Sequence, residues 1–230
     1  MSDQIAVFLP TRTGSQRVKD KNTKPFGGFQ NGLLGLKLKQ LLQVDGIVIY
    51  LSTNDPLSKR IAADIDSSGL KIKVIDRPNE LCLDSTLLSD LIDYVPSIIY
   101  EAHILWTHVT SPLIHSGLYQ KAIDIYLNQL GHGFDSLMTV RKLHEFLWSA
   151  EDNDFVSFDR KIIKWPRTQD IKPLFQVNSG IFLAPRKRYL LGDRIGDRPY
   201  LLELNSFESM DIDWNEDFEL AELIYERANK

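Results

Sequence analysis

The sequence predicts an α/β fold of three layers, α/β/α, in which helices cover both faces of a mainly parallel sheet. Short apolar runs alternate with amphipathic stretches over the first 130 residues, and this order is typical of parallel sheets with right-handed crossovers. The runs are mostly apolar throughout, as expected of strands that are buried on both faces. Polar loops follow several of the runs, at the end of the sheet where such folds bind ligands.

The first half of the chain supplies the regular part of this sheet. Apolar runs predict strands at residues 5–9, 47–51, 71–75 and 104–109. Helical spacing of apolar residues predicts helices at residues 33–43, 56–67, 85–100 and 116–130. In the first of these helices, we expect Lys37, Lys39 and Gln40 on the side opposite the leucines.

The alternation breaks after residue 130. We expect a strand at 135–140, followed by an insertion over about residues 141–175 that projects from the sheet, because short apolar pieces there are mixed with charges. Strands are expected again at 177–184 and 200–204. An acidic amphipathic helix is expected at 215–228, with Asn215 as its N-cap. Residues 1–230 are expected to form a single domain.

Composition argues against several classes of protein. The chain has 230 residues, 43% hydrophobic content and a formal charge of −4, which is unlike a duplex nucleic-acid binder. No apolar run approaches the roughly 20 residues of a membrane span, and the first residues lack the layout of a secretory signal. Cys82 is the only cysteine, which excludes an intrachain disulfide. We therefore expect a cytoplasmic protein without nucleic-acid or membrane partners.

A basic loop, residues 10–24, follows the first expected strand and opposes the charge of the whole chain. Against one acid it holds five cations, which are Arg12, Arg17, Lys19, Lys21 and Lys24. Gly14 and Ser15 let the backbone approach a phosphate, arginines suit bidentate contacts and a lysine supplies a point charge. The loop lacks the glycine patterns of ATPase P-loops and dinucleotide folds. An ordinary solvated loop is the alternative interpretation.

A second candidate site is the carboxylate pair Asp211 and Asp213. Side chains two residues apart in an extended segment point the same way, and Mg²⁺ is commonly held by one or two carboxylates together with substrate phosphates. An acidic turn before the last helix is the alternative. Because one magnesium-bound triphosphate would need both sites, we expect the basic loop and the carboxylate pair to converge in space.

Together these segments resemble the acylneuraminate cytidylyltransferases, the CMP-sialic acid synthetase family, over nearly the whole chain. The strongest element is residues 12–22, Arg-Thr-Gly-Ser-Gln-Arg-Val-Lys-Asp-Lys-Asn, which is similar to the family's Arg-x-Gly-Ser-x-Arg-x-x-x-Lys-Asn loop. The other motifs keep the family's order and approximate spacing; they are Ser52-Thr-Asn-Asp55, Arg77-Pro-Asn-Glu-Leu81, Thr110-Ser-Pro112 and Asp211-Ile-Asp213. The Lys21-Asn22 ending favours sialate-type enzymes over the related Kdo-activating ones.

The resemblance implies a nucleotide-binding α/β fold whose projecting part serves a homodimer. It implies transfer of CMP from CTP to the anomeric hydroxyl of a sialic-acid-like 2-keto sugar acid, with release of pyrophosphate. By resemblance, Arg12, Lys21 and Asn22 bind the CTP phosphates, Arg77 and Leu83 line the nucleoside pocket, and Asp211 and Asp213 hold Mg²⁺. The same resemblance implies that Arg167 and Gln169 meet the sugar acid, with the partner subunit as the expected source. The residues expected to be catalytic are Arg12, Lys21 and Asp211.

Three positions depart from the family pattern. His108 stands where many relatives have Gln, Ser179-Gly180 stands where Gly-Ala is usual, and Leu83 replaces a small residue. We therefore expect an unusual ulosonic acid as the acceptor and count His108 as a substrate contact, with a structural histidine as the alternative. Two other functions stay open: a nucleotidylyltransferase for another sugar, and a catalytically silent nucleotide-binding homologue.

Overall fold

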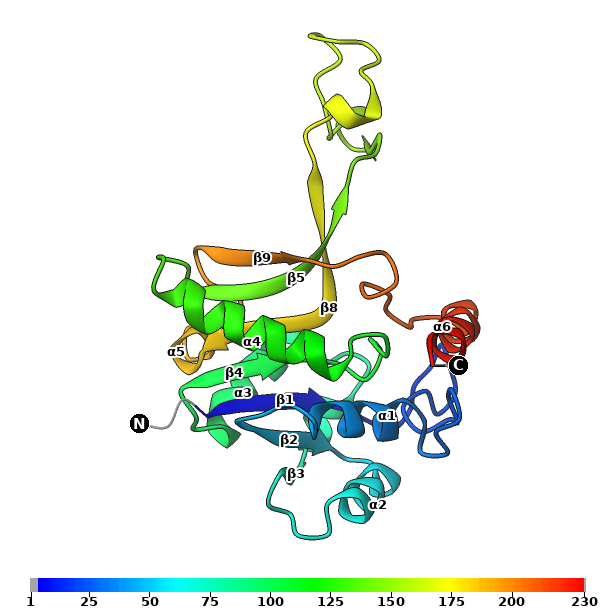
Figure 1. Cartoon of the computed structure of the whole chain (residues 1–230), viewed down its shortest axis with the longest axis vertical. Helices are drawn as coiled ribbons and strands as arrows, with labels where there is room; N and C mark the ends of the chain where they lie inside the picture. The colour runs from blue at the N-terminus through cyan, green and yellow to red at the C-terminus, as the bar shows by residue number, and fades with distance from the viewer. Residues whose placement is uncertain (1–3, 230) are drawn as a thin grey trace.

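In the computed structural model, which describes residues 4–229, seven strands form one sheet in the order β3-β2-β1-β4-β8-β5-β9 (Figure 1). These strands are β1 (Ile5–Pro10), β2 (Ile47–Thr53), β3 (Ile72–Asp76), β4 (His103–Trp106), β5 (Ser136–Leu143), β8 (Leu174–Pro185) and β9 (Pro199–Glu203). Strand β8 runs antiparallel to β4 and β5, whereas the other pairings are parallel. The predicted α/β fold with a mainly parallel sheet is confirmed.

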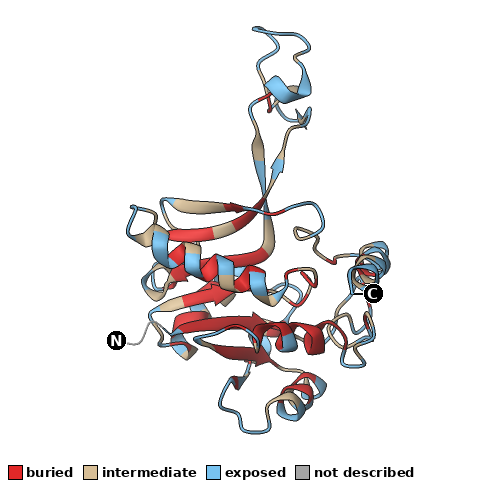
Figure 2. Cartoon of the chain, viewed as in Figure 1, coloured by how far each residue is buried: buried red, intermediate tan, exposed pale blue. Residues whose placement is uncertain are grey.

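Helices lie on both faces of the sheet, as predicted. They are α1 (Gly32–Leu41), α2 (Pro56–Ile65), α3 (Leu88–Ile98), α4 (Ser116–Leu130), α5 (Arg186–Tyr189) and α6 (Asn215–Ala228). Alternate side chains of β1 enter two cores: Val7 packs with residues of α1, α2, α4 and α6, and Phe8 packs with residues of α3 and α5. Both cores are buried against the central strands (Figure 2).

Three strand boundaries, the ends of β4 and β5 and the start of β8, differ clearly from the prediction, and one of them shapes the site. Strand β4 ends at Trp106, so residues 107–110 form a turn at the carboxyl edge of the sheet instead of continuing the strand to 109. Strand β8 begins at Leu174, because its pairing with β5 continues outward as far as Leu143. This two-stranded extension carries the chain away from the sheet.

The expectation of an outward-facing side chain was wrong for Gln40, which is buried, and for Lys37. This residue of α1 is fully buried, and its Nζ donates to the carbonyl oxygens of Ser111 (2.8 Å) and Ile114 (3.3 Å) and to the hydroxyl of Tyr119 (2.8 Å). Burial lowers the pKa of Lys37 well below its usual range. The lysine is buried because these three acceptors satisfy its ammonium donors, and it thereby holds the loop after β4 against α1.

The expected N-cap of the last helix was also wrong. Helix α6 begins at Asn215, and the residue in the N-cap position is Trp214. Asp217, in the first turn, accepts hydrogen bonds from the backbone N–H groups of Trp214 (2.8 Å) and Asp213 (3.0 Å). This reciprocal bond is the second half of a capping box, and it fixes the backbone that carries Asp213.

Between β5 and β8, residues 144–173 form an arm that projects from the sheet (Figure 1). It contains the short hairpin β6 (Trp148–Ser149) and β7 (Asp154–Phe155) and a single turn at Thr168–Asp170. Aromatic rings pack on one another in the arm, with the centroids of Phe155 and Phe158 4.6 Å apart. Few arm residues are buried (Figure 2). Separately, no helix within residues 4–229 is long and apolar enough to cross a membrane.

Candidate active site

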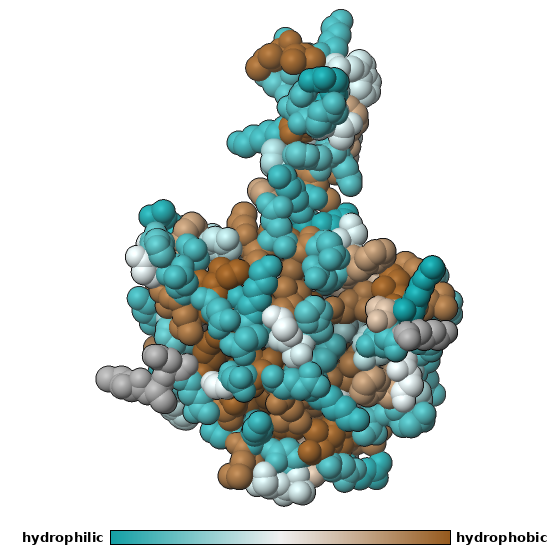
Figure 3. Space-filling view, in the orientation of Figure 1, coloured by the Kyte–Doolittle hydropathy of each residue, from teal (hydrophilic) through white to brown (hydrophobic). Residues whose placement is uncertain are grey.

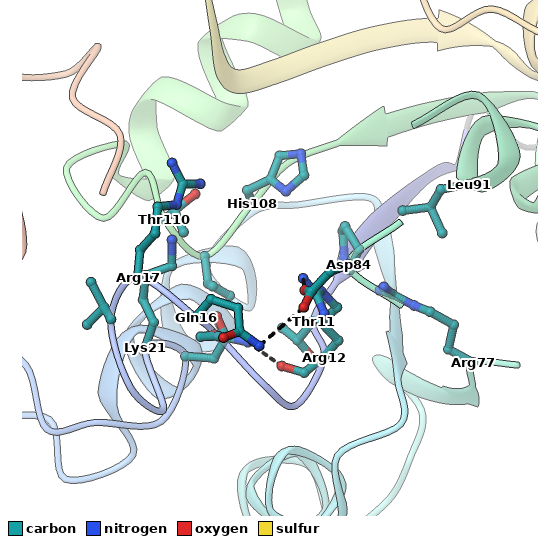
Figure 4. A pocket seen from close by; sticks show the side chains of 15 residues that line it. Thr11, Arg12, Gln16, Arg17, Lys21, Arg77, Asp84, Leu91, His108 and Thr110 are labelled. Carbon is teal, nitrogen blue, oxygen red and sulfur yellow. Dashed lines mark hydrogen bonds and ion pairs between the residues drawn. The ribbon is translucent and has the colours of Figure 1, made fainter. Parts of the chain in front are cut away.

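A cavity of about 440 Å³ lies beside the carboxyl ends of β1 and β4 (Figure 4). The chain leaves β1 toward β2 on one side, whereas β4 lies on the other, so this is the point in the sheet where open α/β folds bind ligands. We call it the loop cavity, because the basic loop supplies most of its wall. The predicted site residues that line it are Arg12, Ser15, Arg17, Lys21, Asn22, Arg77 and His108.

The basic loop is held by backbone contacts at both ends. At its start, the N–H of Thr13 donates to Asn54 after β2, at 3.1 Å. At its end, the carbonyl of Asn22 accepts from the N–H of Leu34, at 2.8 Å. Gly32, with a φ of 60°, passes so close to Lys24 that a Cβ would stand 2.3 Å from its carbonyl oxygen. Only glycine fits there, so the close approach of the loop to α1 depends on it.

The basic loop and the carboxylate pair meet, as expected. Arg17 forms an ion pair of 2.7 Å with Asp213, and its guanidinium lies 5.2 Å from the ring centroid of Trp214. The Nζ of Lys21 donates to the carbonyl oxygen of Ile212, between the two acids, at 2.7 Å. Burial lowers the pKa of Lys21, while Asp213 and Asp211 partly oppose that shift. Segments almost 200 positions apart in the sequence thus form one polar site.

Two more arginines lie in fixed positions on the wall. Arg12 donates to the carbonyl oxygen of Cys82 (3.0 Å) and pairs with Asp84 (2.5 Å). Arg77 is buried and donates to the Ser52 carbonyl oxygen (2.7 Å) at the end of β2. Burial lowers the pKa of Arg77. These contacts direct both guanidinium groups toward the same space (Figure 4).

His108 also lines the loop cavity, and its tautomer follows from its partner. The indole N–H of Trp106 donates to His108 Nε2 at 2.8 Å. Burial, with smaller contributions from Arg194, Arg77 and Lys21, lowers the pKa of His108 to about 3. The imidazole is therefore neutral at ordinary pH, and its single proton resides on Nδ1, because Nε2 is an acceptor. His108 is thus a hydrogen-bond donor through Nδ1 and a weak base.

The carboxylate pair lines a second cavity, of about 450 Å³, which we call the carboxylate cavity. The two cavities adjoin, because Thr110 of the loop cavity accepts a backbone hydrogen bond from Ile212 at 2.9 Å. Burial raises the pKa of Asp211, and the nearby hydroxyls of Thr110 and Ser179 offset part of this effect. Its buried Oδ1 has no hydrogen-bond partner within residues 4–229.

The donors at this point fit a hard cation. Asp211 offers an unpaired carboxylate oxygen, and Asp213 offers a second carboxylate. Over the described part of the chain there is no group of three His, Cys, Asp or Glu residues that would hold a metal alone. Two carboxylates with the remaining ligands from phosphates and water is the usual arrangement for Mg²⁺.

Four predicted site residues lie elsewhere. Gly14 lines a neighbouring hollow and not the loop cavity, although Arg12, Ser15 and Asn22 line both. Leu83 is 57% exposed and does not line the loop cavity, whereas its neighbour Asp84 does. Arg167 and Gln169 lie on the arm, away from both cavities (Figure 1), and Arg167 pairs with Asp170 at 2.7 Å.

Sequence reasoning missed three residues that the structure places at the site. Gln16 and Asp84 join the basic loop to the segment after β3 through a hydrogen bond of 3.2 Å. Arg141 lines the carboxylate cavity from β5. The motif around Asp84 gave a weak signal, since it follows the Arg77 segment closely. No local pattern marks Arg141, because it lies in β5, which is separated in the sheet from β1 by β4 and β8.

Comparison with known proteins agrees with this geometry. Residues 6–228 match the model of a protein family described as cytidylyltransferase. The chain belongs to this family. The family match confirms the resemblance that the sequence motifs indicated.

Two curated relatives align with most or all of the chain. The chain is 27% identical to the N-acylneuraminate cytidylyltransferase of Escherichia coli O18:K1:H7, over all of this chain and 54% of that protein. It is 25% identical to the N-acylneuraminate cytidylyltransferase of Streptococcus agalactiae, over 92% of this chain and 51% of that protein. The chain therefore spans about half the length of the curated relatives it matches.

Solved structures confirm the fold. A CMP:2-keto-3-deoxy-manno-octonic acid synthetase complexed with CTP matches 98% of this chain and 99% of its own, with a TM-score of 0.68 and 14% identity. The 4-diphosphocytidyl-2C-methyl-D-erythritol synthase of Anaerococcus prevotii matches 96% of this chain and 95% of its own, with a TM-score of 0.69 and 14% identity. At this identity, the likeness concerns the fold alone.

Proposed function

We propose that this protein transfers CMP from CTP to the anomeric hydroxyl of a sialic-acid-like 2-keto sugar acid and releases pyrophosphate. The observation that carries the proposal is the joining of the basic loop to the carboxylate pair through the Arg17–Asp213 and Lys21–Ile212 contacts. A site with cations on one side and carboxylates on the other suits a magnesium-bound triphosphate. The family and the two N-acylneuraminate cytidylyltransferases support the same reaction.

On the nucleotide side, the chain's own residues bind and orient CTP. Arg12, Lys21 and Asn22 contact the phosphates, and backbone N–H groups around Gly14 and Ser15 add further donors. Arg12 and Lys21 stabilise the negative charge that develops on the departing pyrophosphate. Arg77 lines the inner wall, where the Ser52 contacts keep its guanidinium in one position. Phosphoryl transfer depends mainly on such positioning and charge neutralisation.

Asp211 and Asp213 would hold Mg²⁺. When bound, the ion neutralises phosphate charge and lowers the pKa of a coordinated hydroxyl. The capping box of α6 keeps Asp213 in position, since Asp217 accepts from its backbone N–H. Asp211 is restrained by burial beside Thr110 and Ser179.

On the acceptor side, His108 would donate a hydrogen bond from Nδ1 to the substrate. It takes the place of a family Gln, whose amide also donates, so the substitution keeps a donor at this position. With a pKa of about 3, His108 does not suit the role of a general base near neutral pH.

We further propose that the arm pairs two copies of the chain as a homodimer. The arm exposes large apolar side chains; these include Trp148, Val156, Ile162, Ile163 and Trp165. Apolar surface gathers near the end of the arm (Figure 3). An exposed patch of this kind is typical of interaction surfaces. Light scattering on a sizing column tests this, and a monomer at micromolar concentration would contradict it.

The reaction is tested by mass spectrometry of products formed from CTP, Mg²⁺ and a panel of 2-keto sugar acids that includes N-acetylneuraminate and 3-deoxy-manno-octulosonate. We expect one CMP-sugar and stoichiometric pyrophosphate. Parallel reactions with ATP, GTP and UTP, and with sugar 1-phosphates, distinguish a nucleotidylyltransferase for another sugar. Tight binding of CTP without turnover on any acceptor would instead identify a silent homologue.

A further inference from the structure

Arg141 is distinguished from the other arginines of residues 4–229 by lacking any partner while being partly buried. Its Nε is buried and unbonded, and no ion pair, hydrogen bond or ring contact joins its guanidinium to another residue of the described range. Arg60 and Arg227 also lack such contacts, but they are exposed. A partly buried guanidinium without a partner is costly, and Arg141 lines the carboxylate cavity together with Asp211.

Asn178 presents a second unpaired donor beside the same cavity. Its Oδ1 accepts from the Thr139 hydroxyl (2.6 Å) and from the Gly180 N–H (3.0 Å), which fixes the orientation of the amide. Its Nδ2 is buried and has no partner within residues 4–229. A Cβ at Gly180 would stand 2.9 Å from Asn178 Oδ1 and 2.6 Å from Ile114. Because Gly180 has no side chain, the Asn178 amide can occupy this position.

The chemistry of the acceptor says what these donors would bind. In a 2-keto sugar acid, the anomeric carbon bears both the attacking hydroxyl and the carboxylate. If the hydroxyl lies beside Asp211, the carboxylate must lie within a few bonds of it, inside or at the edge of the carboxylate cavity. A guanidinium fork matches the two oxygens of a carboxylate. Asp213 would repel the acceptor carboxylate less than a free carboxylate, because Arg17 pairs with Asp213.

We infer that Arg141, assisted by the Asn178 amide, binds the carboxylate of the acceptor sugar acid within the same subunit. This inference rests on the proposed function. It assigns to Arg141 the role that the family resemblance implied for Arg167. Arg167 lies on the arm and already pairs with Asp170 through two hydrogen bonds, of 2.7 and 3.0 Å.

The test compares Arg141→Gln with the wild-type protein, using N-acetylneuraminate and its methyl ester as acceptors. With the acid, we expect the acceptor KM of Arg141→Gln to rise about 10- to 100-fold, the loss that follows from removing a charged hydrogen bond. The KM for CTP should change less than about twofold. With the ester, the two proteins should have similar acceptor KM values, because the carboxylate charge that Arg141 recognises is absent.

Two further variants serve as controls. Arg141→Lys keeps the charge and should recover part of the loss, which excludes a simple folding defect. Lys142→Gln removes the adjacent, exposed charge of β5, which does not line the cavity, and it should leave the acceptor KM unchanged. Thermal unfolding of all variants monitors the fold.

Three outcomes would overturn the inference. One is an unchanged acceptor KM in Arg141→Gln. Another is an equal loss on the acid and on the ester. The third is a rise in acceptor KM for Arg167→Gln but not for Arg141→Gln, which would return the role to the arm. The proposed function fails separately, if the wild-type protein forms no CMP-sugar with any acid of the panel; the inference then falls with it.

Discussion

The two cavities differ in how their polar groups are paired. In the loop cavity, Arg12, Arg77 and His108 each have a protein partner that fixes their position. In the carboxylate cavity, Arg141, Asn178 and Asp211 each present a buried polar atom without a partner among residues 4–229. The loop cavity is thus organised mainly by the protein itself, with the buried Thr11 hydroxyl as an exception, whereas the carboxylate cavity leaves more of its donors and acceptors open.

This difference indicates where binding is general and where it is specific. A triphosphate is the same in every enzyme that uses it, so contacts that hold the cations in place are sufficient there. Unpaired buried polar groups cost about 1–3 kcal/mol each, and a cavity that keeps them is typical of a binding site whose partner is the ligand. Of the departures from the family pattern, Ser179 lines the carboxylate cavity, in keeping with this division, whereas His108 lines the loop cavity.

The largest effect is expected on the carboxylate side. Asp211→Asn should lower pyrophosphate release about 10³-fold, in the range seen when a charge-stabilising group is removed. The same variant should be at least as stable as wild type in buffer with EDTA, because a neutral amide is buried at lower cost than a carboxylate. Initial rates and thermal unfolding midpoints provide the two measurements.

Asp213→Asn is the matched control for that variant. It also removes a carboxylate, but Asp213 is partly exposed and pairs with Arg17, so we expect loss of activity without a gain in stability. Turnover by Asp211→Asn within tenfold of wild type would remove Asp211 from the mechanism.

The next largest effect is expected in the basic loop. Lys21→Gln should lower kcat/KM for CTP about 100-fold, because Lys21 is held at the junction of the cavities by Ile212. Lys19→Gln removes the same charge from an exposed position of the same loop that does not line the loop cavity, and should change kcat/KM less than about threefold. Equal losses in both variants would mean that the loop acts only by attracting anions from a distance.

The sequence was sufficient for the parts of the molecule whose signals are local. Continuous apolar runs located the strands, and the loops after β1 and β4 were placed at the ligand-binding edge because that edge follows from strand direction alone. The convergence of Arg17 with Asp213 required one further assumption, that a single triphosphate needs both. The residue types supplied that assumption, because cations suit the phosphates of a triphosphate and carboxylates suit the Mg²⁺ that accompanies it.

What the sequence did not reveal depends on tertiary partners. Lys37 has the spacing of a solvent-facing residue, but three acceptors from the loop after β4 and from α4 allow it to be buried. Arg141 lies in a strand without a motif, and only the placement of β5 beside β8 brings it to the cavity. The proton position on His108 is set by Trp106, whose role no spacing indicates.

A smaller effect, on the acceptor KM, is expected from His108, which lies in the turn after β4. His108→Gln keeps a donor and should change the acceptor KM less than about threefold. His108→Phe removes the donor and should raise the acceptor KM up to about tenfold, the equivalent of one neutral hydrogen bond. Steady-state kinetics on the acid identified by product analysis provides the test. An unchanged acceptor KM in His108→Phe would mean that the histidine is structural.

The smallest effect is on stability as a function of pH, and it has opposite signs in the two cavities. His108 has a folded pKa of about 3, whereas an unfolded histidine titrates near 6.5. As the pH falls from about 6.5, the unfolded state takes up a proton that the folded state does not, so wild type should lose stability relative to His108→Gln. Asp211 has a raised folded pKa; as the pH falls toward about 4, the folded state binds its proton first, and wild type should gain relative to Asp211→Asn. Unfolding midpoints measured with EDTA from pH 7 to pH 4 should therefore diverge by a few degrees in opposite directions. Parallel curves for the two pairs would contradict the burial assigned to both groups. They would also contradict the contrast between the loop cavity, where His108 is paired with Trp106, and the carboxylate cavity, where Asp211 Oδ1 has no partner within residues 4–229.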